Sequence, residues 1–577
     1  MRYDRVRRGT FLKRPNRFVA YVEIDGTSEK VHVKNTGRLR ELLWLGVSVY
    51  VQEAENADRA TKWDLIAVEK EGRIVNIDSQ IPNALAWEWI EAGNLLENVD
   101  KIQPEYKYGN SRIDLYVEAG EKKILVEVKG VTLEERGVVR FPDAPSERAV
   151  KHVRELSKAV QDGYEAYVLL VIQLSGAKYF TPNMDTHPAF GEALEEAQKQ
   201  GVHVRAVECD VEPDWIQVKG EVPVILKWPE LYEMAEPIVE WYRENKRELP
   251  WRSHVNAYRV WVSEIMLQQT RVEAVKPYYE RFLSELPGVR ELSEVPEDRL
   301  LKLWEGLGYY NRVRNMQKAA QQIMELHGGE FPHTYEEIRS LKGIGNYTAG
   351  AISSFAYGIP KPAVDGNVLR VVSRILASDE DIMKESVRKK VEAALETVIP
   401  QNAASDFNQG LIELGALVCV PNGMAKCEIC PVAHLCLAKK KDIVMQLPVK
   451  KKAKDRRIED RTVFIFKDGE AAAVQKRPAK GLLAGMYELP NTEGCLDEKE
   501  AVAYCKDLGL TPVRLKKLPP AKHIFSHVEW HMTGYEVIVD ELEKTNNHKF
   551  LFAKLDEIKE KYPMPSAFDG FKRWLGN

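Results

Sequence analysis

The sequence has no long apolar run. Its longest apolar stretch, residues 166–172, is far shorter than the roughly 20 residues that cross a bilayer. Seven Lys or Arg lie among the first 17 residues, but no apolar segment follows them, so we expect no secretory signal. These absences predict a cytoplasmic protein that does not use a membrane.

Cysteine is scarce, and charge of neither sign dominates. The chain has seven cysteines and a formal net charge of −4. Three cysteines are scattered, whereas four lie within 18 residues, which in a reducing compartment favours a metal site over disulfides. The small net charge says nothing in favour of nucleic acid, but a sum over the whole chain can hide local basic faces, so the net charge is uninformative here.

The length and composition indicate several soluble globular domains. The chain has 577 residues, of which 44% are hydrophobic and 29% charged. Because a domain usually has about 100–200 residues, we expect three to five domains.

Local patterns divide the chain into five parts. Short alternating segments predict an OB-like β barrel in residues 1–80. Residues 83–225 have the pattern of an α/β domain, with helices expected at 84–92 and 146–162 and strands at 113–118, 124–128 and 167–172. Long amphipathic segments predict an all-helical domain in residues 230–440. A basic linker (441–459) and a second α/β domain (460–577), with a helix near 498–508, follow.

Two features of the helical part point to chemistry. The segment LKGIGNYTAG (341–350) places Gly343 and Gly345 before a helix, where backbone N–H groups can approach a phosphate closely. About 20 residues later, Asp365 lies at an expected helix start. Taken alone, the glycines also suit a tight turn and Asp365 a plain helix cap.

With the cysteine cluster, these features resemble the helix-hairpin-helix DNA glycosylase superfamily. The segments VSEIMLQQTRV (262–272), WEGLGYY (304–310) and NQGLIELG (408–415) resemble its adenine glycosylase family, commonly called MutY. The resemblance implies that Glu264 protonates the flipped adenine and that Asp365 stabilises the sugar cation or bonds to it, with Tyr347 and Asn367 also catalytic. Adenine is a poor leaving group, so such a reaction needs both an acid and a nearby negative charge.

The same resemblance assigns further positions. Related enzymes that also cleave the strand have a lysine where this chain has Tyr347, so we expect release of adenine without strand cleavage. Arg252, Gln409 and Glu413 match positions that line the adenine pocket. Gln269, Thr270, Leu307 and Tyr309 match residues that contact or wedge the DNA, although core packing also explains Leu307 and Tyr309.

The clustered cysteines are Cys419, Cys427, Cys430 and Cys436, with the spacing C-x7-C-x2-C-x5-C. Four thiolates this close can hold a [4Fe–4S] cluster. Zinc is the rival, but four-cysteine zinc sites usually have two C-x-x-C pairs and this segment has one. The family's first gap is one residue shorter, and Gly423 can absorb the insertion.

The C-terminal part resembles a Nudix fold through GLLAGMYELP (481–490) and the helix that follows. The paired acids that would bind Mg²⁺ are replaced by AYCKDL (503–508), so we expect no hydrolysis there. Phe525, Ser526 and His527 resemble the family's loop that recognises 8-oxoguanine. A plain turn at a strand end is the alternative.

The N-terminal part contains a candidate nuclease site. Asp114, Glu127 and Lys129 have the spacing of a PD-(D/E)xK nuclease core, and two carboxylates and a lysine suffice to bind Mg²⁺ or Mn²⁺ and hydrolyse a phosphodiester. Charged strand ends explain the same residues. The segments NTGR (35–38), ELL (41–43), TL (132–133) and FPD (141–143) resemble the sugar fermentation stimulation protein family, called SfsA, although Lys34 stands where that family commonly has proline.

We therefore predict a fusion of a nuclease-like, DNA-binding domain with a monofunctional adenine DNA glycosylase. Its expected partner is double-stranded DNA in which adenine faces 8-oxoguanine or guanine, bound by a monomer. The alternative is a non-catalytic, iron–sulfur DNA-binding regulator.

Overall fold

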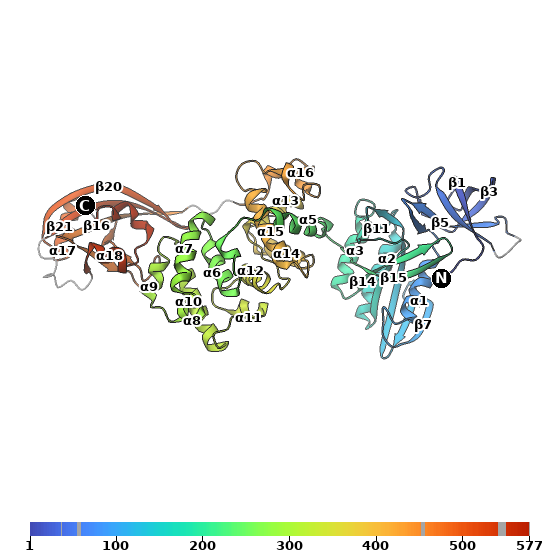
Figure 1. Cartoon of the computed structure of the whole chain (residues 1–577), viewed down its shortest axis with the longest axis horizontal. Helices are drawn as coiled ribbons and strands as arrows, with labels where there is room; N and C mark the ends of the chain where they lie inside the picture. Colours follow the sequence, from blue (N-terminus) through green and yellow to red (C-terminus); the bar gives the residue numbers. More distant parts are fainter. Residues whose placement is uncertain (36, 55–58, 452–455, 540–549, 576–577) are drawn as a thin grey trace. The chain divides into compact units, whose positions relative to one another are not determined.

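The computed structural model describes residues 1–35, 37–54, 59–451, 456–539 and 550–575 (Figure 1). Thr36 of the N-terminal motif and residues 452–455 of the expected linker lie outside the described residues. The chain forms two compact units, Met1–Tyr232 and Glu233–Asn577. No helix in the described part is long and apolar enough to cross a membrane.

The first unit begins with a closed five-strand barrel, as predicted. Its strands are β1 (Val6–Asn16), β2 (Val19–Ile24), β3 (Thr27–Val33), β4 (Ser48–Glu53) and β5 (Trp63–Lys70), with β6 (Arg73–Asn76) beside β5. The barrel closes because β3 pairs with both β2 and β5. Alternate residues of β2, Ala20, Val22 and Ile24, are buried, as expected where successive side chains point to opposite faces.

A six-stranded mixed sheet follows, in the order β15-β14-β12-β9-β8-β7. The strands are β7 (Val99–Tyr108), β8 (Ser111–Ala119), β9 (Lys122–Val131), β12 (Glu165–Ile172), β14 (His203–Glu212) and β15 (Trp215–Val222). A small sheet joins β10 (Leu133–Glu135), β11 (Val138–Phe141) and β13 (Tyr179–Pro182).

Helices cover both faces of the six-stranded sheet. Helix α1 (Ile81–Glu91) packs on one face, and α2 (Glu147–Gln161) and α3 (Pro188–Lys199) pack on the other. The central strand β12 is buried from Ala166 to Ile172, which explains why its apolar run is unbroken. Helix α1 begins three residues before the expected start because Pro82 is well suited to a first helical turn.

The second unit begins with a domain in which the described residues between 235 and 440 form no strand, as predicted. Its helices are α5 (Ala235–Asn245), α6 (Ala257–Leu267), α7 (Val272–Glu285), α8 (Val289–Glu294), α9 (Glu297–Leu303), α10 (Asn311–Leu326), α11 (Tyr335–Ser340), α12 (Asn346–Tyr357), α13 (Gly366–Ile375), α14 (Glu385–Glu396), α15 (Ala404–Leu417) and α16 (Leu437–Lys440). Gly415 lets α15 approach α13 closely, because a Cβ there would lie 2.6 Å from Cβ of Asn367.

The chain ends in an α/β domain with a twisted sheet in the order β18-β17-β16-β21-β20. The strands are β16 (Arg457–Asp468), β17 (Ala471–Lys476), β18 (Tyr487–Glu488), β19 (Asn491–Glu493), β20 (Pro512–Ile524), β21 (Val528–Val539) and β22 (Leu551–Lys554), and the helices are α17 (Glu498–Asp507), α18 (Leu555–Lys561) and α19 (Asp569–Lys572). Strand β16 begins within the expected linker.

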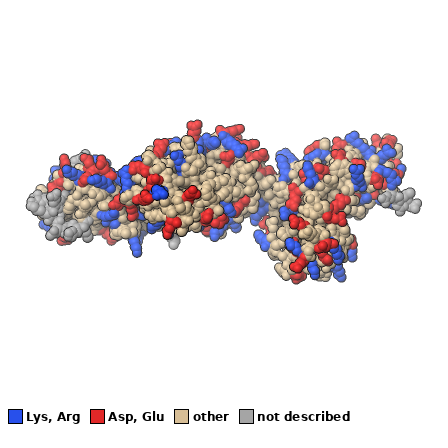
Figure 2. Space-filling view, turned by 60° about the horizontal axis from the view of Figure 1, so that its bottom comes forward, with Lys and Arg blue, Asp and Glu red and all other residues tan. Residues whose placement is uncertain are grey.

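On the face of the molecule shown in Figure 2, basic and acidic side chains are intermixed.

Candidate functional site

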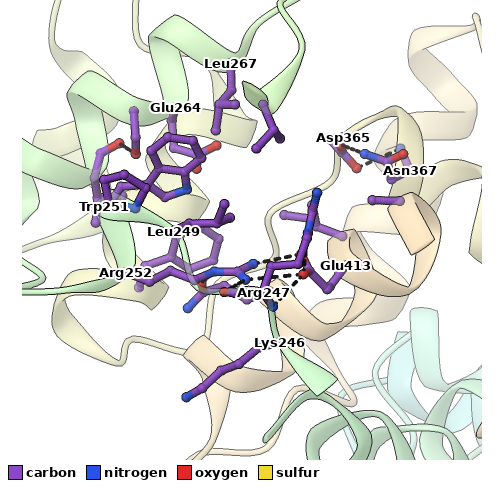
Figure 3. Close-up of a pocket in the computed structure, with 18 of the residues that line it drawn as sticks. Lys246, Arg247, Leu249, Trp251, Arg252, Glu264, Leu267, Asp365, Asn367 and Glu413 are labelled. Carbon is purple, nitrogen blue, oxygen red and sulfur yellow. Dashed lines mark hydrogen bonds and ion pairs between the residues drawn. The ribbon is translucent and has the colours of Figure 1, made fainter. Parts of the chain in front are cut away.

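A cavity of about 1850 Å³ opens among the helices of the second unit (Figure 3). Many of the residues singled out from the sequence line it: Arg252, Glu264, Gln269, Thr270, Tyr347, Asp365, Asn367, Gln409 and Glu413. They come from α6, α12, α13, α15 and the loops beside α6. The fold therefore brings together side chains from segments more than 150 residues apart.

Glu264 is a buried acid on α6. Glu264 is only 6% exposed, and the hydroxyl of Tyr347 on α12 donates a hydrogen bond to its Oε2. Burial raises the pKa of Glu264 to about 7, and the negative charge of Asp365 adds to that rise, while the hydrogen bond from Tyr347 opposes it. Burial also raises the pKa of the Tyr347 phenol well above its ordinary value. Glu264 is thus able to hold a proton near neutral pH.

Asp365 is the N-cap residue of α13, so the plain structural role considered from the sequence is real. Its Oδ1 accepts hydrogen bonds from the backbone N–H groups of Asn367 and Val368, both at 2.8 Å, and its Oδ2 accepts one from Nδ2 of Asn367 at 2.7 Å. Burial raises the pKa of Asp365, while these hydrogen bonds favour its charged form. Arg370 holds Asn367 in turn, 2.8 Å from its Oδ1. The cap therefore also aims a carboxylate at the cavity.

Glu413 is a fully buried carboxylate, held by two arginines (Figure 3). Nε and Nη2 of Arg247 lie 2.7 and 2.9 Å from its two oxygens, and Nη2 of Arg252 lies 2.9 Å from Oε2. Although burial opposes ionisation, these hydrogen bonds lower the pKa of Glu413 to about 2. Arg252 also donates to Gln409 at 3.2 Å, as does the hydroxyl of Tyr242 at 2.9 Å.

Sequence reasoning missed Arg247 and Tyr242. Arg247 lies in a run of charged residues just before α6 and could be read as a solvated side chain. Its partner is 166 residues away, and no local spacing indicates that contact.

A second cavity, of about 850 Å³, lies where the helical and C-terminal domains of the second unit meet. Its lining includes Leu307, Tyr309, Gly343, Phe525, Ser526 and His527. The last three residues form the turn between β20 and β21, where Ser526 and His527 are exposed. Residues from two distant segments, those predicted to wedge the DNA and those predicted to recognise 8-oxoguanine, therefore line the same cavity. Leu307 itself is only 6% exposed.

Arg312, which sequence reasoning also missed, lines the second cavity and bonds to two segments beside it. Its Nη1 donates to the carbonyl oxygens of Ile265 and Gln268, both at 2.7 Å, and its Nη2 to those of Leu307 and Gly308 at 2.9 and 3.0 Å. One guanidinium thus fixes both the end of the helix that carries Glu264 and the loop that carries Tyr309. Tyr309 is 51% exposed and has a left-handed φ of 47°.

The glycine-containing turn connects α11 to α12, as expected for a helical hairpin. Gly343 has a φ of 79°, a left-handed conformation that glycine adopts without strain. Gly345 is the N-cap residue of α12.

The four clustered cysteines line one small, mostly apolar pocket. Nη1 of Arg374 lies 3.2 Å from Sγ of Cys419, and Sγ of Cys436 lies 3.3 Å from the carbonyl oxygen of Arg374. Within the described residues, no three His, Cys, Asp or Glu side chains converge closely enough to hold one metal ion. Gly423, in the longer first gap, has a φ of 78°, and a Cβ there would meet no atom within 4 Å. The four thiols nevertheless share one shielded pocket, and a multi-iron cluster, unlike a single ion, needs one thiolate for each iron rather than several on the same metal.

In the first unit, the antiparallel register that pairs Leu115 with Val126 brings Asp114 and Glu127 opposite each other. Asp114 accepts hydrogen bonds from the N–H of Val128 at 2.8 Å and from Asn83 at 3.3 Å. Burial raises the pKa of Asp114, and the charge of Glu127 adds to the rise.

Glu127 is 1% exposed, and its two carboxylate oxygens differ in their hydrogen-bond partners. Lys129 and Nδ1 of His152 both hydrogen-bond to Oε1. Oε2 is buried and has no hydrogen-bond partner among the described residues. Such a buried, unpaired carboxylate oxygen fits a cation ligand. His152 and Asn83 were missed, because helices α2 and α1 bring them to the strands from elsewhere in the sequence.

Comparison with known families divides the chain in the same order. The SfsA N-terminal OB domain matches residues 12–77, and the sugar fermentation stimulation protein RE domain matches residues 80–215. The HhH-GPD superfamily of base excision DNA repair proteins matches residues 262–400, and the NUDIX domain matches residues 461–572.

Individual relatives match parts of the chain. A sugar fermentation stimulation protein homolog from Desulfitobacterium hafniense is 57% identical over 226 residues, which are 39% of this chain and 99% of that protein. Pyrococcus furiosus SfsA, solved in complex with Ca²⁺, is 32% identical over 39% of this chain and 98% of its own, with a TM-score of 0.37. Endonuclease III in a non-covalent DNA complex is 26% identical over 38% of this chain and 99% of its own, with a TM-score of 0.33.

Proposed function

This chain belongs to the sugar fermentation stimulation protein family, and because a base excision DNA glycosylase domain follows that family's part of the sequence, we propose that the second unit excises adenine paired with 8-oxoguanine or guanine. The observation that carries the proposal is Glu264, a buried carboxyl whose pKa is raised to about 7 in a cavity that also contains Asp365. This is the acid and negative charge that N-glycosidic cleavage of adenine requires.

Glu264 protonates the adenine ring as the glycosidic bond breaks. A pKa near the working pH lets a group both hold and deliver its proton. Tyr347 orients the carboxyl, since its hydroxyl donates to Oε2 and leaves Oε1 free of that bond. The water that completes hydrolysis loses its proton to the ionised Glu264.

Asp365 stabilises the positive charge that develops on the sugar. Its three hydrogen bonds from Asn367 and Val368 fix the carboxylate before substrate binds. Such preorganisation lowers the barrier because no dipoles need to reorganise during reaction. Arg252 and Gln409 recognise the edge of the flipped base, and Glu413 holds Arg252 in place.

The enzyme leaves the strand intact. Tyr347 offers a phenol rather than an amine, so it cannot form a Schiff base with the sugar aldehyde. The product is an abasic site in duplex DNA, released by a monomer.

Recognition of 8-oxoguanine is assigned to Phe525, Ser526 and His527. The exposed Ser526 and His527 offer hydrogen-bonding groups, and they share a cavity with Tyr309 and Leu307, which wedge the opposite part of the duplex. A base pair opened at this cavity would meet both sets of side chains, which supports discrimination of the partner base.

A [4Fe–4S] cluster is proposed at Cys419, Cys427, Cys430 and Cys436. The cluster would cross-link the end of α15 to the loop that follows it, and its charge would complement nearby arginines. Arg374 supports this assignment, since its guanidinium lies 3.2 Å from Sγ of Cys419, where a cationic donor favours a thiolate.

The first unit has a second candidate function, metal-dependent phosphodiester hydrolysis at Asp114, Glu127 and Lys129. The unpaired Oε2 of Glu127, which faces Asp114 across the paired strands β8 and β9, supports it at the level of the two residues. These carboxylates would hold Mg²⁺ or Mn²⁺, which would supply Lewis-acid stabilisation of a phosphate.

The glycosylase is tested by single-turnover excision on a duplex containing adenine opposite 8-oxoguanine. The full chain should produce an alkali-labile site, and Glu264→Gln should abolish it while duplex binding persists. Glu285→Gln, at an exposed ion pair with Arg299 on the same domain, is the matched control and should remain active. Binding without turnover by the wild-type chain would instead support a non-catalytic iron–sulfur regulator.

A further inference from the structure

The proposed glycosylase makes a product that its own site does not process further. Without a lysine at the position of Tyr347, the abasic strand keeps its phosphodiester backbone. The reaction that must consume this product is therefore cleavage of a phosphodiester next to the missing base. The following inference rests on that proposed function.

The first unit contains groups suited to this cleavage. Lys129 and His152 occupy Oε1 of Glu127, and Oε2 is buried without a hydrogen-bond partner, while Asp114 lies opposite Glu127 on the neighbouring strand. His152 is itself 6% exposed, so its contact with Glu127 is shielded from water. Two side chains bound to one oxygen fix the carboxylate and leave the other, buried oxygen without a protein partner, which a bound cation would satisfy.

We propose that the first unit hydrolyses the backbone at the abasic site that the second unit creates, so that one chain performs two successive steps. Water adds to phosphorus, and the bond between phosphorus and the neighbouring 3′-oxygen breaks. The water's proton passes to solvent, and the departing 3′-oxygen takes up a proton. The products are a 3′-hydroxyl and a 5′-phosphate, and no oxidant or reductant is needed.

Covalent linkage supplies the reason for pairing these sites. Residues 223–234 connect the last strand of the first unit to the first long helix of the second. A tether this short gives the site in the first unit a high effective concentration near DNA that the glycosylase in the second unit has already bound.

At the site in the first unit, His152 is a positioning residue, since it acts through Glu127.

The experiment uses the full chain with Mn²⁺ and two duplexes, one with adenine opposite 8-oxoguanine and one with a tetrahydrofuran abasic analogue opposite 8-oxoguanine. The analogue has no aldehyde and cannot undergo β-elimination, so any break in it is hydrolytic. Wild type should cut the damaged strand of both duplexes, and EDTA should prevent cutting. Glu264→Gln should cut only the analogue. Glu127→Gln should leave an unbroken, alkali-labile strand from the adenine duplex.

Metal binding gives a readout that is independent of cleavage. Calorimetric titration should show Mn²⁺ binding that Glu127→Gln and Asp114→Asn remove. His152→Ala should weaken it by about 10–100-fold, as expected when a partner of a metal ligand is lost. His152→Gln should recover part of the affinity, because its amide can still contact Glu127. Unchanged binding in His152→Ala would overturn its positioning role.

Cooperation is tested by mixing the Glu264→Gln and Glu127→Gln chains. The mixture should cut the adenine duplex more slowly than wild type at equal concentration, because the abasic strand must pass between molecules. An equal rate would overturn coupling, and equal cutting of undamaged duplex would overturn preference for the abasic site. No cutting of the analogue overturns the hydrolytic step, whereas loss of adenine excision alone counts only against the glycosylase.

Discussion

The hydroxyl of Tyr347 donates a hydrogen bond to the buried carboxyl of Glu264, across 83 residues of sequence. The donor stabilises the charged form of Glu264 and so limits how far burial raises its pKa. In the proposed glycosylase, the same side chain stands where a lysine would give strand cleavage. One residue would therefore both tune the pKa of the acid and restrict the reaction to base release.

Tyr347→Phe should move the pH profile of excision upward. Since the acid must be protonated, the rate falls as pH rises through the pKa of Glu264, which is about 7. Removing the hydrogen bond raises that pKa further, so the fall should begin at higher pH in single-turnover assays. Tyr357→Phe, on the same helix, removes only a bond to the carbonyl oxygen of Phe331 and should leave the profile unchanged. A downward shift for Tyr347→Phe would contradict the assignment.

Glu264→Gln should stabilise the protein at neutral pH. The folded-state pKa of Glu264 is raised from 4.5 to about 7, so ionisation favours the unfolded chain and stability is lost as pH rises through this window. Relative to the Gln variant the loss should reach on the order of 3 kcal/mol. Urea unfolding at pH 4.5 and pH 8 measures it. A difference between variants that shrinks as pH rises would show that the carboxyl is not destabilised by burial.

Two substitutions at Asp365 should separate its structural role from its chemical role. Asp365→Asn keeps a good cap for α13 but removes the charge, so excision should fall at least about 100-fold with little change in stability. Asp365→Ala should lose as much activity and a further ~1 kcal/mol of stability, because the cap is also gone. Rapid-quench excision and thermal unfolding measure the two effects, and an active Asn variant would argue against the electrostatic role.

Glu413→Gln should destabilise the domain. It leaves Arg247 and Arg252 without their buried counter-charge, a loss of about 3–5 kcal/mol. The control is Asp406→Asn, which breaks the exposed pair with Arg243 on the same helices and should cost under about 1 kcal/mol. Equal losses of unfolding free energy in the two variants would show that the buried ion pairs of Glu413 stabilise the domain no more than the exposed pair does.

Arg312→Lys should slow excision more than it weakens DNA binding. A lysine keeps the charge but does not reach the carbonyl groups on both the α6 end and the Leu307 loop. Displacement of catalytic groups by about 1 Å can cost about 100-fold in rate. Base flipping, followed with a fluorescent adenine analogue, should be impaired in the same variant. Normal flipping and excision would mean that the guanidinium only supports the fold.

Cys436→Ser should lower the iron and sulfide content of purified protein, because it removes one of four thiols around the pocket. Cys495→Ser changes an exposed cysteine outside that pocket and should leave the content unchanged. Stoichiometric zinc without iron in the wild-type protein would rule out the cluster.

The predicted fold depended on signals that are local in sequence. The β-strand alternation of residues 17–24, the capped helix that starts after Ser146 and the apolar run of residues 166–172 each reflect a short-range period, and each appears in the structure. The first residues of the elements were predicted less accurately: α1 begins earlier than expected, and β16 begins inside the expected linker.

Among the site residues, the sequence by itself determined which chemical groups are present: Glu264, Asp365, four clustered cysteines, and Asp114, Glu127 and Lys129. Only the tertiary structure decided their states. Burial and the neighbouring phenol set the pKa of Glu264, and a glycine contact between α13 and α15 sets where Asn367 lies. Arg247, Arg312 and His152 acquire their roles from partners that are 25 or more residues away or on other elements. No local period encodes such contacts, because desolvation and ion pairing depend on what the folded chain places around each group.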